Sequence, residues 1–238
     1  MNRTHATAAP LVGTLTIGQA PRADVTPILE AHLPRGTWCV HAGVLDDLSP
    51  REIEEQFGYR AGGRLLVTRL TDGTVVDLDG DRIEVAVRDG LAQLEARGCG
   101  VIVLLCTGTF HGLSCERAWL VEPDRVIAPV VSAMLGARRL GVVVPAEPQI
   151  ASEAGKWSSL AVRPVFAVAS PYADDVRALR EAVVALRGEG ADAIVLDCIG
   201  FTERHRLVAT DAAGLPVLLS NAIVARVAGE LVASCSGK

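Results

Sequence analysis

The chain has 238 residues, of which 50% are hydrophobic, 21% are charged and 4% are aromatic. This length can bury the core of one large domain or two small ones, and the aliphatic composition is typical of α/β proteins and excludes a disordered chain. With 23 Lys and Arg against 28 Asp and Glu, the formal net charge is -5, so the chain offers no basic field to a phosphate backbone and nucleic acid is not an expected partner.

The N-terminus and the six cysteines indicate the compartment. Residues 1–10 contain no apolar stretch of the kind that a secretory signal carries, and no apolar run in the sequence reaches membrane-spanning length. We therefore expect a cytoplasmic protein with reduced thiols and no membrane partner. None of the cysteines has the spacing of a zinc site, so no metal is expected.

The first part of the chain alternates short aliphatic runs with helical patterns, which predicts parallel strands joined by helices. Strands and helices are expected to alternate over residues 11–17, 25–32, 37–44 and 50–57. Ser49 and Glu52 have the spacing of a capping box in front of the last of these helices. Residues 64–83 alternate apolar and polar side chains around Asp72 and Gly73, which predicts a small β insertion.

Two later segments repeat each other at an offset of 92 residues. Residues 88–108 (RDGLAQLEARGCGVIVLLCTG) align with residues 180–200 (REAVVALRGEGADAIVLDCIG). Each copy predicts a helix, a glycine stop, a buried strand and then Cys-x-Gly at the carboxyl end of the strand. A further strand and helix are expected after each copy, over residues 125–129 and 130–135, and over residues 216–219 and 221–232.

The repeat predicts two similar parallel-sheet α/β domains related by a pseudo-twofold axis. We place the first domain at residues 1–137, with the β insertion at 64–83, and the second domain at residues 138–220. The C-terminal helix, over residues 221–238, is expected to pack back on the first domain.

Cys106 and Cys198 occupy equivalent positions in the repeat. Ligands bind at the carboxyl ends of strands in open parallel sheets, so the two thiols can lie on opposite walls of one cleft. The alternative is that both are core residues, because free cysteine is often buried. Two opposed thiols can act as acid and base on opposite faces of one carbon and so invert its configuration without a cofactor. A single thiol could instead serve a decarboxylation or an addition to a double bond.

Polar groups near the two cysteines are the candidate substrate contacts. Backbone N–H groups of residues 107–109 and 199–202 could hold developing negative charge. Arg22 is the candidate anchor for a carboxylate, with Gln19 beside it; the alternative is a solvated Arg22 that pairs with Asp24. The complete set of candidate contacts is Thr16, Gln19, Arg22, Thr107, Gly108, Thr109, Gly200, Phe201, Thr202, Ser220 and Asn221.

Three polar residues near Cys198 are candidate modulators of its thiol. Asp197 ends a buried strand and needs a basic or backbone partner, and its effect on the thiol is left open. His205 could lower the pKa of a thiol or carry a proton. His205 and Arg206 could equally belong to a solvated helix face.

Other polar residues have structural explanations beside functional ones. Pro145 and Gln149 are expected at a strand end that faces the cleft. Ser220 and Asn221 could form a helix N-cap as well as bind a ligand. Lys156 and Trp157 are expected on a solvent-facing helix with one buried ring, rather than on a lid over the site.

Six segments spread along the chain carry a family resemblance. They are LTIGQAPRAD (15–24), LLCTGTF (104–110), EPDRVIAPVV (122–131), VVVPAEPQ (142–149), LDCIGFTERHR (196–206) and PVLLSNAIVARVAGEL (216–231). Together they resemble the AroM family, within the aspartate/glutamate racemase superfamily. The resemblance implies two α/β domains with one cysteine from each at their interface, here Cys106 and Cys198. The wider superfamily includes amino-acid and hydantoin racemases, maleate cis-trans isomerase and arylmalonate decarboxylase.

The chain departs from the amino-acid racemases of that superfamily after both cysteines. It lacks the Asn-Thr that follows their first cysteine and the Thr-His or Thr-Glu that follows their second. This difference argues against a free amino acid as the substrate.

The sequence therefore favours a cofactor-independent racemase or isomerase of a small carboxylate, with Cys106 and Cys198 exchanging acid and base roles. One alternative is a decarboxylase or lyase that uses a single cysteine. Another is a non-catalytic protein that binds a small metabolite in a racemase-like cleft. The expected partner is a small carboxylate or a related metabolite, and a homodimer is compatible with the sequence.

Overall fold

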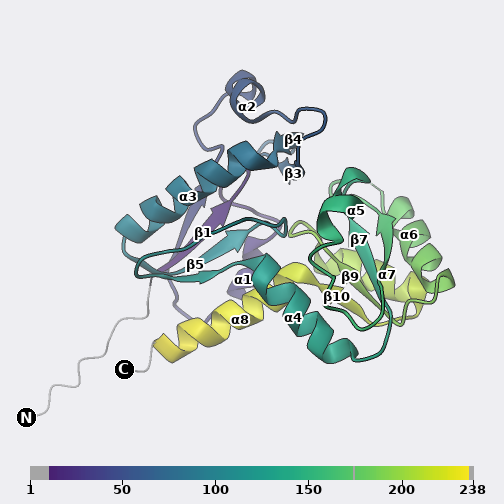
Figure 1. The fold of residues 1–238 in the computed structure, drawn as a ribbon. Helices are drawn as coiled ribbons and strands as arrows, with labels where there is room; N and C mark the ends of the chain where they lie inside the picture. Colours follow the sequence, from purple (N-terminus) through teal and green to yellow (C-terminus); the bar gives the residue numbers. More distant parts are fainter. Residues whose placement is uncertain (1–10, 174, 236–238) are drawn as a thin grey trace, which may run out of the picture.

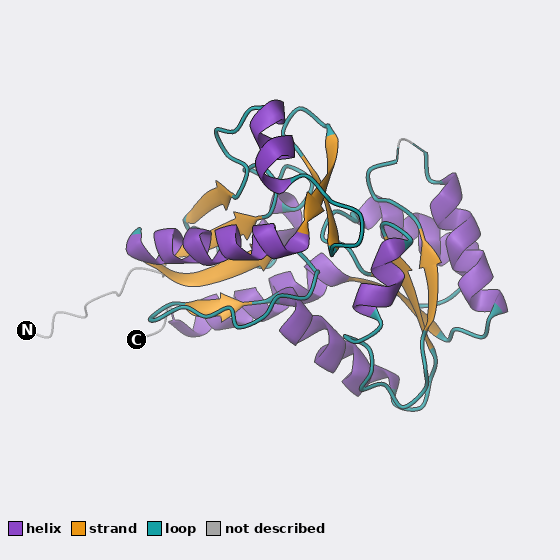
Figure 2. Cartoon of the chain, turned by 45° about the horizontal axis from the view of Figure 1, so that its top comes forward, coloured by secondary structure: helices purple, strands orange, loops and turns teal. Residues whose placement is uncertain are grey.

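The computed structural model describes residues 11–173 and 175–235. Residues 1–10, on which the expectation about a secretory signal depends, lie outside this part of the chain. The described residues form two four-stranded sheets and one two-stranded hairpin, with helices against the sheets (Figures 1 and 2). None of the described helices combines the length and the apolar character needed to cross a membrane.

The elements follow one another in the expected alternation. The first ten are β1 (Leu11–Thr16), α1 (Thr26–Glu30), β2 (Cys39–Gly43), α2 (Pro50–Phe57), β3 (Leu65–Arg69), β4 (Val75–Asp79), α3 (Gly80–Ala96), β5 (Cys99–Leu105), β6 (Trp119–Val121) and α4 (Pro123–Leu135). The remaining eight are β7 (Leu140–Val144), α5 (Pro148–Glu153), β8 (Val165–Val168), α6 (Arg177–Gly188), β9 (Ala193–Leu196), α7 (Glu203–Ala213), β10 (Val217–Leu219) and α8 (Ser220–Cys235).

The two large sheets have the same topology, which confirms the predicted similarity of the two halves. Their strand orders are β2-β1-β5-β6 and β8-β7-β9-β10, and every pairing within them is parallel. The inner strands β5 and β9 occupy equivalent places and come from the two copies of the sequence repeat. Their carboxyl ends therefore present Cys106 and Cys198 at equivalent edges.

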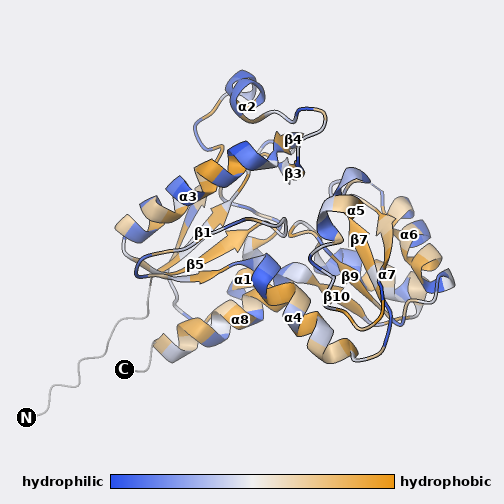
Figure 3. Ribbon diagram, in the orientation of Figure 1, coloured by the Kyte–Doolittle hydropathy of each residue, from blue (hydrophilic) through white to orange (hydrophobic). Residues whose placement is uncertain are grey.

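One apolar cluster joins the two halves. It contains Val101 and Val103 of β5 together with Val142 of β7 and Val195 of β9. The helix α8 contacts α1, α4 and β5, although it follows the last strand of the second sheet. Figure 1 shows α8 running under the first sheet, and Figure 3 shows the apolar strands at the centre of each half. This shared core sets the positions of the two strand ends relative to each other.

The hairpin β3–β4 is a separate antiparallel sheet. Its turn is formed by Asp72 and Gly73, as predicted: Gly73 has a φ of 93°, and the Asp72 carboxylate accepts a hydrogen bond from the Thr74 N–H. The hairpin ends at Asp79, whose carboxylate caps α3. The helix therefore begins at Gly80, earlier than the repeat alone suggested, and residues 80–83 belong to it rather than to the β insertion.

The predicted strand at residues 125–129 is wrong. Residues 123–135 form the single helix α4, and the strand before it is β6. Ile127, Val131 and Leu135 recur every four residues and are all buried, so they line one helix face. Pro129 lies inside this helix, which made the segment read as two elements.

Candidate functional site

Cys106 and Cys198 line one cavity between the two halves. Cys106 directly follows β5, Cys198 lies two residues after β9, and both side chains are buried. The wall also takes residues from β3, from the end of β7 and from α5. It is lined by Ile17, Arg22, Leu66, Val67, Thr68, Leu105, Cys106, Thr107, Gly108, Pro145, Gln149, Cys198 and Ile199. The two cysteines of the repeat thus reach the same space from opposite halves.

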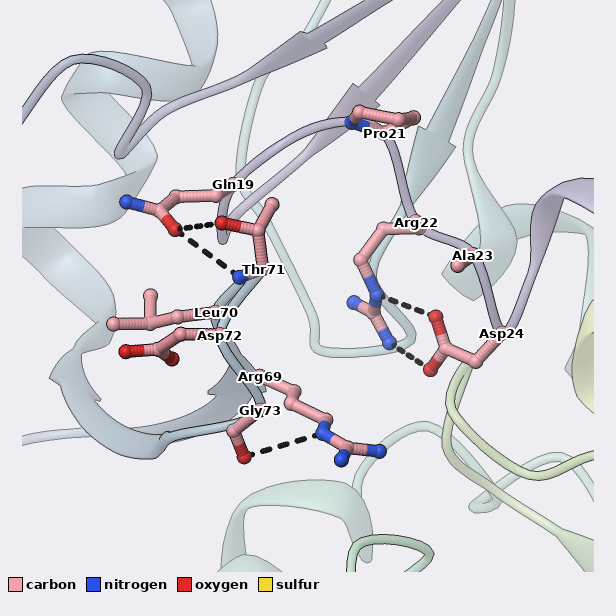
Figure 4. Close-up of a pocket in the computed structure, with 10 residues that line it drawn as sticks. All are labelled: Gln19, Pro21, Arg22, Ala23, Asp24, Arg69, Leu70, Thr71, Asp72 and Gly73. Atoms are coloured by element: carbon pink, nitrogen blue, oxygen red, sulfur yellow. Dashed lines mark hydrogen bonds and ion pairs between the residues drawn. The ribbon is translucent and has the colours of Figure 1, made fainter.

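The cysteine cavity is small and has a larger neighbour. Its volume is about 20 Å³, which is room for about one water molecule. An outer pocket of about 470 Å³ lies between residues 19–24 and the hairpin turn (Figure 4). Arg22 lines both spaces. A carboxylate ligand can therefore occupy the cysteine cavity only if its wall moves.

Burial keeps both thiols protonated at neutral pH. It raises the pKa of Cys106 to about 12, against the opposing effect of the Gly108 N–H. It raises the pKa of Cys198 to about 11, and here the Gly200 N–H and the Arg22 guanidinium oppose it. The closed cavity therefore contains two proton donors rather than a thiolate and a thiol.

Arg22 is buried and paired. Its Nε and Nη2 donate to the two carboxylate oxygens of Asp24 at 2.8 and 2.7 Å, and its side chain is only 4% exposed. The pairing with Asp24 that the sequence offered as an alternative is present, but in a buried place rather than a solvated one. Nη2 also donates to the hydroxyl of Tyr172 at 3.2 Å, which links the first half to the second.

Tyr172 is a site residue that the sequence analysis missed. Its hydroxyl lies 4.0 Å from the Sγ of Cys198, and its ring fills the space in front of Gly200, where a Cβ would come within 2.7 Å of it. In the first half, Leu66 fills the space in front of Gly108 in the same way. The two glycines therefore make room for side chains that cover the cysteines. The position of Tyr172 after a strand end was the available signal.

Lys156 overturns the expectation of a solvent-facing side chain. Its side chain is 1% exposed, and its Nζ donates to both oxygens of Asp197 at 3.0 and 2.8 Å. Nζ also donates to the carbonyl of Thr107 at 2.8 Å and pairs with Glu153. Asp197 thus has the basic partner that its burial requires, and this ion pair ties the loop after Cys106 to the residue before Cys198.

Three other candidates of the first half, Thr16, Gln19 and Thr109, lie outside the wall of the cysteine cavity. The Thr16 hydroxyl accepts from the Gly18 N–H at 3.2 Å. Gln19 faces the outer pocket, where its Oε1 accepts from the backbone and the hydroxyl of Thr71 (Figure 4). The Thr109 hydroxyl donates to Asp124 at 3.2 Å. Thr107 and Gly108 do line the cavity.

Several candidates of the second half hold the loop after β9 in place. Ser220 donates to the carbonyl of Leu196 and to Asp197. Asn221 donates to the carbonyls of Ile199 and Phe201, and the Phe201 ring is part of the core. These contacts support the strand end and do not reach the cavity.

A third pocket, beside Tyr172, contains the other polar candidates. It is lined in part by Gly200, Thr202 and His205 and has a volume of about 290 Å³. The His205 ring accepts from the Thr202 N–H at 2.9 Å and caps α7, while burial lowers the pKa of His205. Arg206 is paired with Glu203 outside these pockets. In residues 11–173 and 175–235, no group of three or more His, Cys, Asp and Glu side chains could hold a metal ion.

Comparison with known proteins identifies a family and a fold. The family model described as AroM protein matches residues 12–232. The fold is similar to that of allantoin racemase from Pseudomonas fluorescens, with a TM-score of 0.62, 18% identity and coverage of 94% of this chain and 91% of that one.

Two further solved structures have the same fold. Picrophilus torridus aspartate racemase matches with a TM-score of 0.60 and 14% identity over 94% of both chains. Unliganded arylmalonate decarboxylase matches with a TM-score of 0.55 and 16% identity over 96% of this chain and 93% of that one. No curated protein sequence matches this chain.

Proposed function

This chain belongs to the AroM family, and we propose that it is a cofactor-independent racemase or isomerase of a small carboxylate. The observation that carries the proposal is the meeting of Cys106 and Cys198, from equivalent strand ends of two similar halves, in the wall of one cavity. Structures described as aspartate and allantoin racemases share the fold. Two acid–base groups of one kind, reaching a common space from opposite halves, suit proton exchange at a single carbon.

The proposed step transfers two protons. One cysteine, as thiolate, takes the proton from the carbon next to the carboxylate, and the bonding electron pair stays on that carbon as an enolate. The other cysteine donates its thiol proton to the opposite face. The thiol and thiolate have then exchanged places, and the configuration of the carbon is inverted. The N–H groups of Gly108 and Gly200 stabilise the thiolate form of the neighbouring sulfurs.

Hydrogen exchange in deuterated water tests this proposal. The protein is incubated with a panel of small carboxylates and cyclic imides, and deuterium at the carbon next to the carbonyl is measured by NMR. The single variants Cys106→Ala and Cys198→Ala, together with the double variant, are the controls. Exchange that depends on both cysteines supports racemisation or isomerisation. Its absence with every compound of the panel contradicts it.

A single-cysteine decarboxylase is the second candidate, and the protonation of the thiols favours it. Loss of carbon dioxide from a malonate-type acid leaves a carbanion, which a neutral thiol can protonate; the resulting thiolate regains its proton from water. Both thiols have raised pKa values, and the cavity wall includes the apolar side chains of Ile17, Leu66 and Ile199. Release of carbon dioxide that requires only one of the two cysteines would support this function over the first.

A further inference from the structure

Thr68 lines the cysteine cavity and carries an unpaired hydroxyl. Its side chain is buried, and its Oγ1 has no hydrogen-bond partner among the described residues. Three other buried side-chain atoms share this property, but their residues do not line the cavity: Glu122 Oε2, Trp157 Nε1 and Asn221 Oδ1. An unpaired buried hydroxyl reduces stability, so one on a residue of the cavity wall is available to a ligand once the wall moves.

Thr68 belongs to the element that closes the cavity. Residues 66–68 of β3 form part of its wall, and Leu66 covers the loop after Cys106. The hairpin is held at its turn by Gln19, which accepts two hydrogen bonds from Thr71 (Figure 4). At its other end, Gln149 reaches the carbonyl of Leu65 at 3.5 Å. These polar contacts, together with Leu66 and Leu70 in the apolar core of the first half, join the hairpin to the rim of the site, next to the outer pocket.

We propose that the hairpin β3–β4 is the lid of the cysteine cavity and that Thr68 is its substrate-binding residue, donating a hydrogen bond to a carboxylate oxygen. This inference rests on the proposed function and adds a specificity residue to it. Arg22 lines the same cavity, but Asp24 already occupies its Nε and Nη2. The hydroxyl of Thr68 therefore supplies a donor that no described side chain or backbone group engages. In the closed protein the cavity has room for about one water molecule, which the ligand displaces.

Two alkylating reagents of similar size test the role of Thr68. Iodoacetate is a small carboxylate and iodoacetamide is its neutral counterpart. Each forms a sulfur–carbon bond with a thiolate and releases iodide. Peptide mass spectrometry gives the two rates at Cys106 and Cys198, with Cys115 as a reference outside the cavity. The ratio of the iodoacetate rate to the iodoacetamide rate then reports recognition of the carboxylate.

The variants Thr68→Val and Thr68→Ser separate the hydroxyl from the shape of the side chain. Loss of one hydrogen bond to a charged group predicts that Thr68→Val lowers the ratio at both cavity cysteines about tenfold. The ratio at Cys115 stays the same, and Thr68→Ser stays close to wild type. An unchanged ratio for Thr68→Val, or the same loss for Thr68→Ser, overturns the assignment.

Loosening the hairpin turn tests the lid. Gln19→Ala removes both contacts to Thr71, and we expect iodoacetamide to modify Cys106 and Cys198 several times faster, with no change at Cys115. Gln56→Ala, a matched change at an exposed position on α2, leaves all three rates unchanged. Equal rates in wild type and Gln19→Ala overturn the lid. Alkylation requires no turnover, so these results stand apart from the hydrogen-exchange test of the function.

Discussion

Lys156 Nζ lies 2.8 Å from Oδ2 of Asp197, and both side chains are buried behind the two cysteines. The same ammonium group donates to the carbonyl of Thr107. The Lys156 ammonium group therefore joins the loop after Cys106 to Asp197, the residue before Cys198, although the two segments come from different halves. This contact and the shared apolar core both link the two segments that carry the thiols.

Replacing Lys156 should destabilise the fold strongly. Lys156→Met leaves the carboxylates of Asp197 and Glu153 buried without their cation, so we expect a loss of about 3–5 kcal/mol in the free energy of unfolding, measured with urea. Arg51→Gln breaks an exposed pair with Glu55 and should cost less than about 1 kcal/mol. Similar losses in the two variants would contradict the structural role of Lys156.

Glu153 should make stability depend on pH. Burial raises the pKa of Glu153 to about 7, against the attraction of Lys156. The usual value in an unfolded chain is about 4.3, so between these values the folded state binds the proton more tightly, and stability falls as the pH rises through this window. Glu153→Gln cannot ionise. Its free energy of unfolding relative to wild type should therefore rise by about 2–3 kcal/mol from pH 5 to pH 8. The free energy of unfolding is measured with urea at both pH values. The same difference between Glu153→Gln and wild type at pH 5 and at pH 8 would refute this.

Tyr172 should favour the thiolate of Cys198 selectively. Its hydroxyl lies 4.0 Å from the sulfur, and this hydrogen bond lowers the pKa of Cys198. Tyr172→Phe should slow the reaction of Cys198 with iodoacetamide at fixed pH by about two- to tenfold. The rate at Cys106, measured in the same sample, is the internal control. Equal slowing at both cysteines would point to a general change of the cavity instead.

Gly200 should not tolerate a side chain. A Cβ at this position would lie 2.7 Å from the ring and hydroxyl of Tyr172, so Gly200→Ala should cost about 1–3 kcal/mol of unfolding free energy. A Cβ at Gly155 would have no heavy atom within 4 Å, and Gly155→Ala should be neutral or slightly stabilising. Thermal unfolding of the two variants provides the comparison, and equal Tm values would contradict the close packing.

The pH dependence of turnover should separate the two candidate reactions. A racemase needs one thiolate, and the pKa values of about 11 and 12 predict that kcat/KM rises about tenfold per pH unit between pH 7 and 10. A decarboxylase that uses a neutral thiol should show little change over this range. For racemisation, Cys106→Ala and Cys198→Ala should each lower the rate at least about 100-fold. A flat profile together with one dispensable cysteine would favour decarboxylation.

Local patterns in the sequence were sufficient to predict that two sheets share a topology, that the hairpin turns at Asp72 and Gly73, and that Cys106 and Cys198 follow strands. Apolar side chains that recur every two or about every four residues indicate the buried face of a single strand or helix. The sequence repeat indicates that the two halves share a topology. The pattern failed at α4, because Pro129 was interpreted as the end of an element, although it is an exposed residue inside the helix and Ile127 and Val131 line the buried face.

The tertiary structure decided which side chains surround the thiols. Lys156 and Thr68 carry no local mark of their roles, and Tyr172 carries only its position after a strand end, because each meets its partners or its cavity across segments that are far apart in the chain. A buried lysine in an ion pair and a solvated lysine look the same in sequence, since only packing supplies the counter-charge. The sequence alone thus determined that Cys106 and Cys198 follow the ends of two strands. The packing of the two halves determined that the hairpin forms part of the wall of the cysteine cavity.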